Sequence, residues 1–196
     1  KYPEKVLNGT RIIAKKGDSE GWELKISTPC LSERYLHFEG ELDHIMTTII
    51  LPNLTEFLSL SRRVESLEDG ESRDSLLSRI KESKENVMKG GLMFFFYWAH
   101  FAPLSRGTSA TGYAVMQAYF LSVGESMVEP VPVKKQLDFE AMFRACPYDF
   151  VSHVFPWMSN RMLTPIPLSY LNNEKGYRLS DIFNTSRKMM SVFVAQ

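Results

Sequence analysis

Cysteine is scarce in this sequence, with only Cys30 and Cys146 among 196 residues. The two lie far apart and show none of the paired spacings of metal-binding cysteines. This excludes a disulfide-dense secreted scaffold and predicts free or buried thiols, which persist in a reducing compartment. We therefore expect a cytoplasmic protein, either in its own cell or, if it is an effector, in the cytoplasm of a host.

An excess of charge of either sign is also missing, because 23 Lys and Arg balance 23 Asp and Glu. General nucleic-acid binders are usually markedly basic, so we expect no nucleic acid as a partner. The longest apolar run, residues 92–101, is shorter than the ~20 residues of a membrane-spanning helix, so no membrane span is expected. No signal peptide is visible at the start of the sequence. The first residue is Lys1 rather than Met, which indicates a fragment or a processed product.

Familiar catalytic motifs are absent. The sequence contains no HExxH, GxSxG or Walker loop, and no cluster with metal-type spacing, so no metal is predicted. Its composition, 44% apolar and 23% charged, is that of a globular protein. A chain of this length fits one hydrophobic core, and we predict a single, mainly α-helical domain over residues 1–196.

Residues 93–121, MFFFYWAHFAPLSRGTSATGYAVMQAYFL, are the stretch around which we expect the chain to be organised. A buried helix over 92–101, a polar turn at 103–109 and a second buried helix over 110–123 are predicted. A helix start rich in Ser, Thr and Gly offers backbone N–H groups to an anion, and Arg106 adds a cation. Ordinary helix capping explains the same residues and is the commoner origin of such a pattern.

The rest of the chain divides into a hairpin, a helical core and C-terminal helices. Residues 11–15 and 22–28 flank a turn-prone segment, which predicts a β-hairpin at 10–28 packed on the helices or over a cleft. The helical core is expected at 33–124, with a break at Pro52, a mobile loop over 64–74 and a new helix near Ser75. Gly90 and Gly91 predict a kink or a close backbone approach. After a Pro-rich linker, the C-terminal helices are expected within 136–196, one of them stopped by Pro156.

Three further side chains are candidates for a site. Asp138 follows the linker at a helix start, where either capping or contact with a ligand explains it. Arg34 follows the hairpin and is either an ordinary surface residue or, if the hairpin folds over the turn, a functional one. His100 lies within the aromatic run, where a hydrogen-bonded core histidine is a simpler interpretation than a catalytic base.

The run FFFYWAHFAPLSRGTSATGYAVMQAYFL, with LDFEAM and YDFVSHVFPWM after the linker, resembles the C-terminal half of AvrB-like proteins of the Fic/Doc (Fido) superfamily. The shared features are a Trp-containing helix, a Pro-x-x-Arg-Gly-Ser/Thr turn, a second helix and an Asp-x-Glu-Ala-Met segment. The pattern is also similar to the domain that follows the tetratricopeptide repeats in a eukaryotic immune-suppressor family, where Thr28-Pro29 is matched as well. The resemblance covers residues 90–158 well and residues 10–50 weakly.

This resemblance implies a Fido-like helical core in which the hairpin is a flap over a nucleotide-binding turn. Fic enzymes carry their catalytic histidine where this sequence has Ala102, and an acidic residue where it has Arg106. In the catalytic motif of Fic enzymes, a Gly and then an Asn follow that acidic residue. This sequence has Gly107 and Thr108 at those two positions. AvrB-like members also lack the histidine, and they are associated with nucleotide binding and with attaching a deoxysugar to a protein.

The resemblance further implies a nucleotide or nucleotide sugar as co-substrate. Asp138 would be the catalytic residue, contacting the sugar or activating the acceptor. The co-substrate would be bound by Arg106, Gly107, Thr108, Ser109, Arg34 and Thr28. The implied function is transfer of a nucleotide-derived group, most simply a sugar, onto a Ser, Thr or Tyr hydroxyl of a protein. The alternative is a catalytically inactive Fido-fold module that interacts with a signalling partner.

Overall fold

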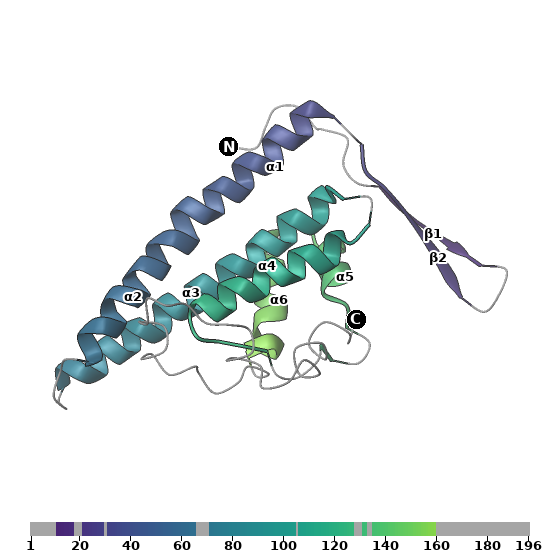
Figure 1. The fold of residues 1–196 in the computed structure, drawn as a ribbon. Helices are drawn as coiled ribbons and strands as arrows, with labels where there is room; N and C mark the ends of the chain where they lie inside the picture. Colours follow the sequence, from purple (N-terminus) through teal and green to yellow (C-terminus); the bar gives the residue numbers. More distant parts are fainter. Residues whose placement is uncertain are drawn as a thin grey trace.

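The computed structural model describes residues 11–17, 21–29, 31–65, 71–104, 106–127, 131–132 and 135–159. This part of the chain is mainly helical and has one two-stranded antiparallel sheet at its N-terminal end, as the sequence predicts (Figure 1). Cys30 and the part of the predicted C-terminal helical region after residue 159 lie outside the described residues. None of the described helices is both long and apolar enough to cross a membrane.

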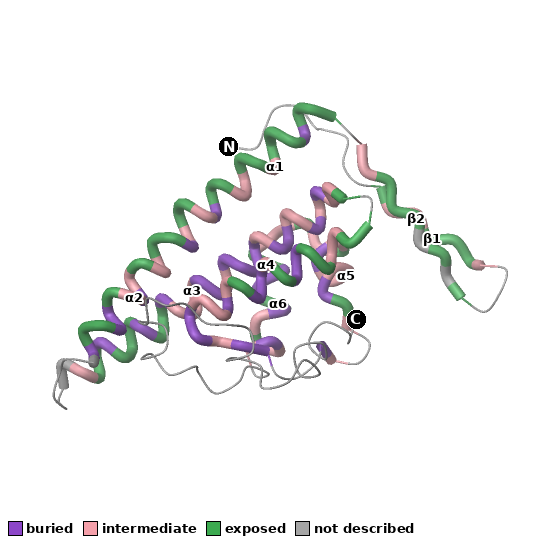
Figure 2. Tube along the Cα trace, viewed as in Figure 1, coloured by how far each residue is buried: buried purple, intermediate pink, exposed green. Residues whose placement is uncertain are grey.

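Strands β1 (Arg11–Lys16) and β2 (Trp22–Ser27) form the predicted hairpin, with Arg11 opposite Ser27. Figure 1 shows the hairpin extending away from the helices rather than packing across them, so the expected flap position is wrong for most of its length. Its described side chains are exposed or half-buried (Figure 2). A two-stranded ribbon buries too little apolar surface on its own to hold it against a core.

Three helical segments follow one another without a break: α1 (Ser32–Ile45), the π-helix η1 (Met46–Ile50) and α2 (Leu51–Glu65). The prediction that Pro52 ends this helix is therefore wrong. The π-helix changes the bonding just before the proline, since the Leu51 N–H donates to Met46 O, five residues back. The Asn53 side-chain amide donates to Ile49 O at 2.7 Å. Pro52 thus lies inside a continuous helix, where the widened π turn and a side-chain donor accompany the missing N–H.

Helices α3 (Glu71–Phe101), α4 (Thr108–Ser122), α5 (Leu137–Met142) and α6 (Pro147–Ser159) complete the described fold. Because α3 begins ahead of Ser75 and α2 includes residues 64 and 65, the loop expected over 64–74 is shorter than predicted. Pro156 lies inside α6 and does not stop it. The carbonyl that it leaves unpaired belongs to Ser152, which is exposed like Pro156 itself, so water can bind there.

Helix α3 is the centre of the core and packs against α1, α2, α4, α5 and α6. Figure 2 shows buried residues concentrated on α3 and α4, while α1 is mostly exposed. The largest fully buried side chains include Phe57, Phe95, Tyr113, Phe120 and Phe150. These aromatic groups come from α2, α3, α4 and α6, so the predicted aromatic run does fill the core.

Two glycines allow helices to approach α3 closely. A Cβ on Gly90 would lie 2.7 Å from Ile50 Cγ1, and one on Gly112 would lie 2.4 Å from Trp98 Cδ1. Helix α3 continues through Gly90 without interruption, so the close approach is confirmed and the kink is not found. The second contact fixes α4 against the last turns of α3, where the candidate site begins.

Candidate active site

The turn between α3 and α4 contains two left-handed backbone positions, Ala102 at φ 45° and Gly107 at φ 76°. The conformation is accessible to glycine but costs other residues about 1–2 kcal/mol. Thr108 closes the turn, because its hydroxyl donates to Leu104 O at 2.9 Å and accepts from the Leu104 N–H at 3.2 Å. Trp98 Nε1–H donates to Thr108 O at 2.8 Å, which ties the start of α4 to α3. The Thr108 hydroxyl thus has partners inside the turn.

The first turn of α4 directs backbone donors toward solvent. Thr111 N–H bonds to Gly107 O at 2.9 Å, which is the first bond of the helix. The N–H groups of Thr108, Ser109 and Ala110 precede it and have no acceptor within the helix. The N-cap is Gly107, which carries no side chain to accept from them. This helix start therefore offers backbone N–H groups of the kind that bind anions, while anion binding there stays a prediction.

Asp138 lies against the first turn of α4. Ser109 Oγ donates to Asp138 Oδ2 at 2.9 Å, and the Phe139 N–H donates to Oδ1 at 3.0 Å. Gln136 is the N-cap of α5, so Asp138 is an acid in the first turn of the helix and not its cap. Each carboxylate oxygen can accept more than one hydrogen bond, which leaves Asp138 able to accept from a substrate hydroxyl.

Arg34 is buried, with 4% of its surface exposed, and is therefore neither a surface residue nor part of the cleft lining. Its guanidinium donates to Phe101 O at 2.9 Å and to His100 O at 2.5 Å, the last carbonyls of α3. It also lies 4.9 Å from the Phe38 ring centroid. A cation that bonds the C-terminal carbonyls of a helix is favoured by the helix dipole. Arg34 thus holds the point at which α3 ends and the turn begins.

A cleft of about 710 Å³ lies beside the turn, within the size range of small-molecule sites. It brings together six of the predicted residues from three separate parts of the sequence: Thr28, the turn residues Arg106, Gly107, Thr108 and Ser109, and Asp138. The Arg106 side chain is exposed there and has no ion pair among the described residues. A cation, a helix start and a carboxylate therefore face one space.

The cleft also has an apolar wall that the sequence analysis missed. Ile26, Tyr35, Leu104 and Met142 contribute to it. Among the hairpin side chains that the structure describes, those bordering the cleft are Ile26 and Thr28, at the base of the hairpin. Met142 follows Asp138 by one helical turn, so the spacing alone indicates that the two share a face of α5. No pattern in the sequence indicates that Tyr35 reaches the same space.

His100 makes the hydrogen bond that the sequence predicts, but it is half-buried at the edge of the core. Its Nδ1 lies 2.9 Å from Phe96 O, and its ring centroid is 4.1 Å from that of Phe96. Burial lowers the pKa of His100 below its ordinary 6.5, and the charge of Arg34 acts in the same direction. Backbone hydrogen bonds involving Phe96 and Arg144 oppose this shift. The ring does not line the cleft.

The described residues define a mainly helical protein with an N-terminal hairpin and a cleft at a helix–turn–helix junction. Comparison with curated proteins finds 28% identity over 155 residues to "Suppressor of RPS4-RLD 1" from Arabidopsis thaliana, covering 79% of this chain and 13% of that protein. It also finds 31% identity over 74 residues to "Tetratricopeptide repeat protein 13" from Homo sapiens, covering 38% of this chain and 8% of that protein.

The matched region is thus a small part of each relative, 13% and 8% of its length. No protein-family model matches the chain. No solved structure matches it either. Similarity to a plant suppressor protein and to a tetratricopeptide repeat protein is therefore established, while the Fic/Doc relationship stays a prediction.

Proposed function

We propose that this chain forms a transferase domain of the AvrB type, which binds a nucleotide or nucleotide sugar and modifies a hydroxyl of a protein. One observation carries the proposal: Arg106, the start of α4 and Asp138 line the same cleft. A diphosphate carries negative charge that Arg106 and the backbone N–H groups of Ser109 and Ala110 would balance. The apolar wall offers room for the uncharged part of the same ligand.

In the proposed reaction, the acceptor hydroxyl oxygen attacks the anomeric carbon of the sugar. A new carbon–oxygen bond forms as the bond to the diphosphate breaks, and the nucleoside diphosphate leaves with the electron pair. The hydroxyl proton passes to the Asp138 carboxylate, which already accepts from Ser109 and has capacity for another donor. Arg106 would stabilise the charge that develops on the leaving diphosphate. No step requires a histidine at position 102.

A second candidate function is a catalytically silent interaction module, and the hydrogen bonds of the turn favour it. The hydroxyls of Thr108 and Ser109 are engaged with Leu104 and Asp138, as they would be in a purely structural turn. One relative is named as a suppressor and the other as a tetratricopeptide repeat protein, and neither name states a reaction. Under this hypothesis, the cleft would have no nucleotide to bind.

Titration calorimetry of the chain against a panel of nucleotides and nucleotide sugars separates the two functions. The transferase proposal expects saturable binding that Arg106→Ala weakens by about tenfold to a hundredfold, the loss of a charge-assisted contact. Arg79→Ala is the matched control, because Arg79 is an exposed arginine paired with Glu56 away from the cleft. Absence of binding across the panel, from a folded sample, would favour the interaction module.

A test of transfer then requires Asp138→Asn, which keeps the shape of the side chain but removes its capacity to take a proton. We expect this variant to bind the donor nucleotide and to lose transfer to an acceptor protein. If Asp138→Asn transfers at the wild-type rate, the proposed role of this carboxylate is wrong.

A further inference from the structure

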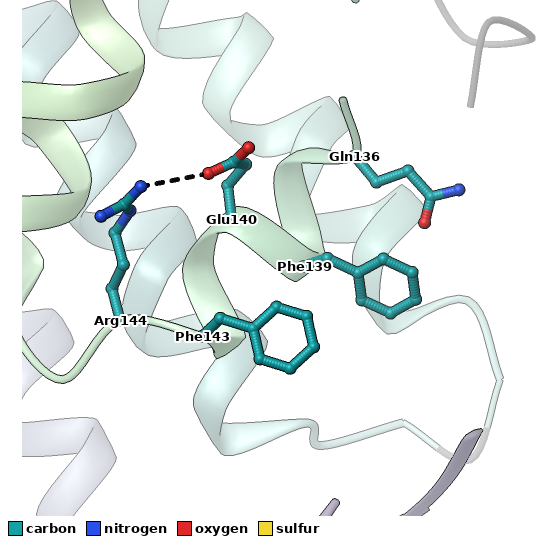
Figure 3. A pocket seen from close by; sticks show the side chains of 5 residues that line it. All are labelled: Gln136, Phe139, Glu140, Phe143 and Arg144. Atoms are coloured by element: carbon teal, nitrogen blue, oxygen red, sulfur yellow. Dashed lines mark hydrogen bonds and ion pairs between the residues drawn. The ribbon is translucent and has the colours of Figure 1, made fainter. Parts of the chain in front are cut away.

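A second hollow lies along α5, on a different side of the helix from the candidate cleft. Its volume is about 440 Å³, and its lining is Gln136, Phe139, Glu140, Phe143 and Arg144 (Figure 3). We call it the α5 groove. Asp138 and Met142 face the cleft, whereas Leu137 and Ala141 are buried in the core. The three sets follow the helical period, so α5 presents one face to each environment.

Two aromatic rings form the apolar floor of the α5 groove. Phe139 and Phe143 lie one helical turn apart with ring centroids separated by 5.9 Å, and both project to the same side in Figure 3. Phe143 is 67% exposed, which is unusual for a residue that prefers the interior. Exposed apolar groups bordered by polar ones mark interaction sites. The pair can accept one more large apolar side chain against its rings.

Charged side chains in the groove and beside it carry a net positive charge; Glu140 and Arg144 line the groove, and Lys135 and His153 reach Glu140 from outside the lining. Glu140 is contacted by Lys135 Nζ at 2.9 Å, by Arg144 Nη2 at 3.3 Å and by His153 Nε2 at 3.2 Å. Burial works against ionisation of Glu140, but hydrogen bonds from Lys135 and Arg144 outweigh it and keep the pKa of the carboxyl below its ordinary value. One carboxylate therefore faces two permanent cations, which leaves positive charge in excess among these groups.

Arg144 can bond a second acceptor besides Glu140, because a guanidinium carries five N–H donors. Its Nε is buried and makes no hydrogen bond with the described residues, although Nη2 contacts Glu140. Because Nε is inaccessible, a partner would bond the other guanidinium nitrogens, and the Arg144 side chain is 29% exposed. The acceptor that matches the surplus charge is a carboxylate, since carboxylates bind guanidinium groups through two parallel bonds.

We propose that the α5 groove docks a short segment of a partner protein that carries a large apolar side chain next to a carboxylate. The apolar side chain packs against Phe139 and Phe143, and the carboxylate binds Arg144 and Lys135. The segment is a monoanion at this point rather than a phosphate, because Glu140 remains between the cations and repels a multiply charged group. This docking does not depend on transfer chemistry in the cleft.

The experiment selects from a library of random short peptides on the intact chain and measures the enriched peptides by fluorescence anisotropy. The expected peptides place Asp or Glu beside Trp, Phe or Leu. Phe143→Ser should weaken their binding at least tenfold, roughly the value of one aromatic contact and its buried area. Arg144→Gln should weaken peptide binding and make the affinity less dependent on salt concentration. Leu36→Ser, which changes another exposed apolar residue on a different helix, is the matched control and should bind as wild type.

Several results would overturn the proposal. The selection yields no enriched sequence, or yields peptides that lack an acid, or yields peptides that bind Phe143→Ser as tightly as wild type. Sedimentation that reveals a dimer lost in Phe143→Ser would assign the groove to a second copy of this chain instead. If AMP displaces the peptide from the wild-type protein, and Phe143→Ser no longer binds AMP, the α5 groove is a nucleotide site instead.

Discussion

Replacement of Arg34 by Met tests whether this residue holds the end of α3 or serves a ligand. The substitution keeps much of the buried length of the side chain but removes the donors to Phe101 O and His100 O. Each hydrogen bond to a charged group contributes about 1.5–3 kcal/mol. The helix dipole adds about 0.3–1 kcal/mol, and the contact with the Phe38 ring about 0.5–2 kcal/mol. Hydration of the freed carbonyls recovers part of the loss, so we expect the free energy of unfolding to fall by about 3 kcal/mol.

Urea denaturation monitored by circular dichroism measures this loss. With a slope of about 2 kcal/mol per molar urea, the midpoint should fall by about 1.5 M. Arg79→Met is the control, since Arg79 and Glu56 are 53% and 41% exposed and such a surface pair contributes only about 0–1 kcal/mol. If the free energies of unfolding of Arg34→Met and Arg79→Met differ by less than 1 kcal/mol, the structural role of Arg34 is refuted. A stable variant that loses nucleotide binding would instead return Arg34 to the ligand site.

Two further predictions concern the helices that frame the turn. Gly112→Ala should lower the free energy of unfolding by about 1–3 kcal/mol in the same assay, because the new Cβ must displace the Trp98 ring that bonds Thr108 O; an unchanged midpoint would contradict the close packing. His100 has a folded pKa below 6.5, so the unfolded chain binds the extra proton first, and stability should fall as pH drops from about 6.5 toward the folded pKa. His100→Gln should flatten this part of the stability curve, and an equal slope in both proteins would show that His100 is not the cause.

Much of the fold follows from local patterns in the sequence. Alternation and the Gly-rich turn predict the hairpin, and the apolar periods on either side of Pro103 predict the α3–α4 pair. Both errors at prolines have one origin, because sequence rules treat a missing N–H as a helix end. At Pro52, the π-helix and the Asn53 side chain supply donors to nearby carbonyls, and at Pro156 the affected carbonyl belongs to Ser152, an exposed residue. Such compensation depends on neighbours that a local pattern does not include.

The candidate site was predictable where it depends on the turn itself. Arg106 to Ser109 are contiguous, and Asp138 stands at the start of a helix, so each could be selected from sequence alone. The role of Arg34 could not, because its partners His100 and Phe101 lie more than sixty residues away. The position of Tyr35 in the cleft wall could not be predicted for the same reason, since it depends on how α1 crosses the end of α3.

The π-helix Met46–Ile50 has a consequence for how α1 reaches that position. A single π turn holds one residue more than an α turn. It therefore changes how far α1 is rotated about the helix axis relative to α2. If the same residues formed a plain α-helix instead, α1 would be turned by about 100° and shifted by about 1.5 Å along the axis relative to α2, which is the rotation and rise of one residue. Arg34 would then point away from the end of α3. The π turn thus sets the rotation of α1 at which the Arg34 guanidinium reaches the carbonyls of His100 and Phe101.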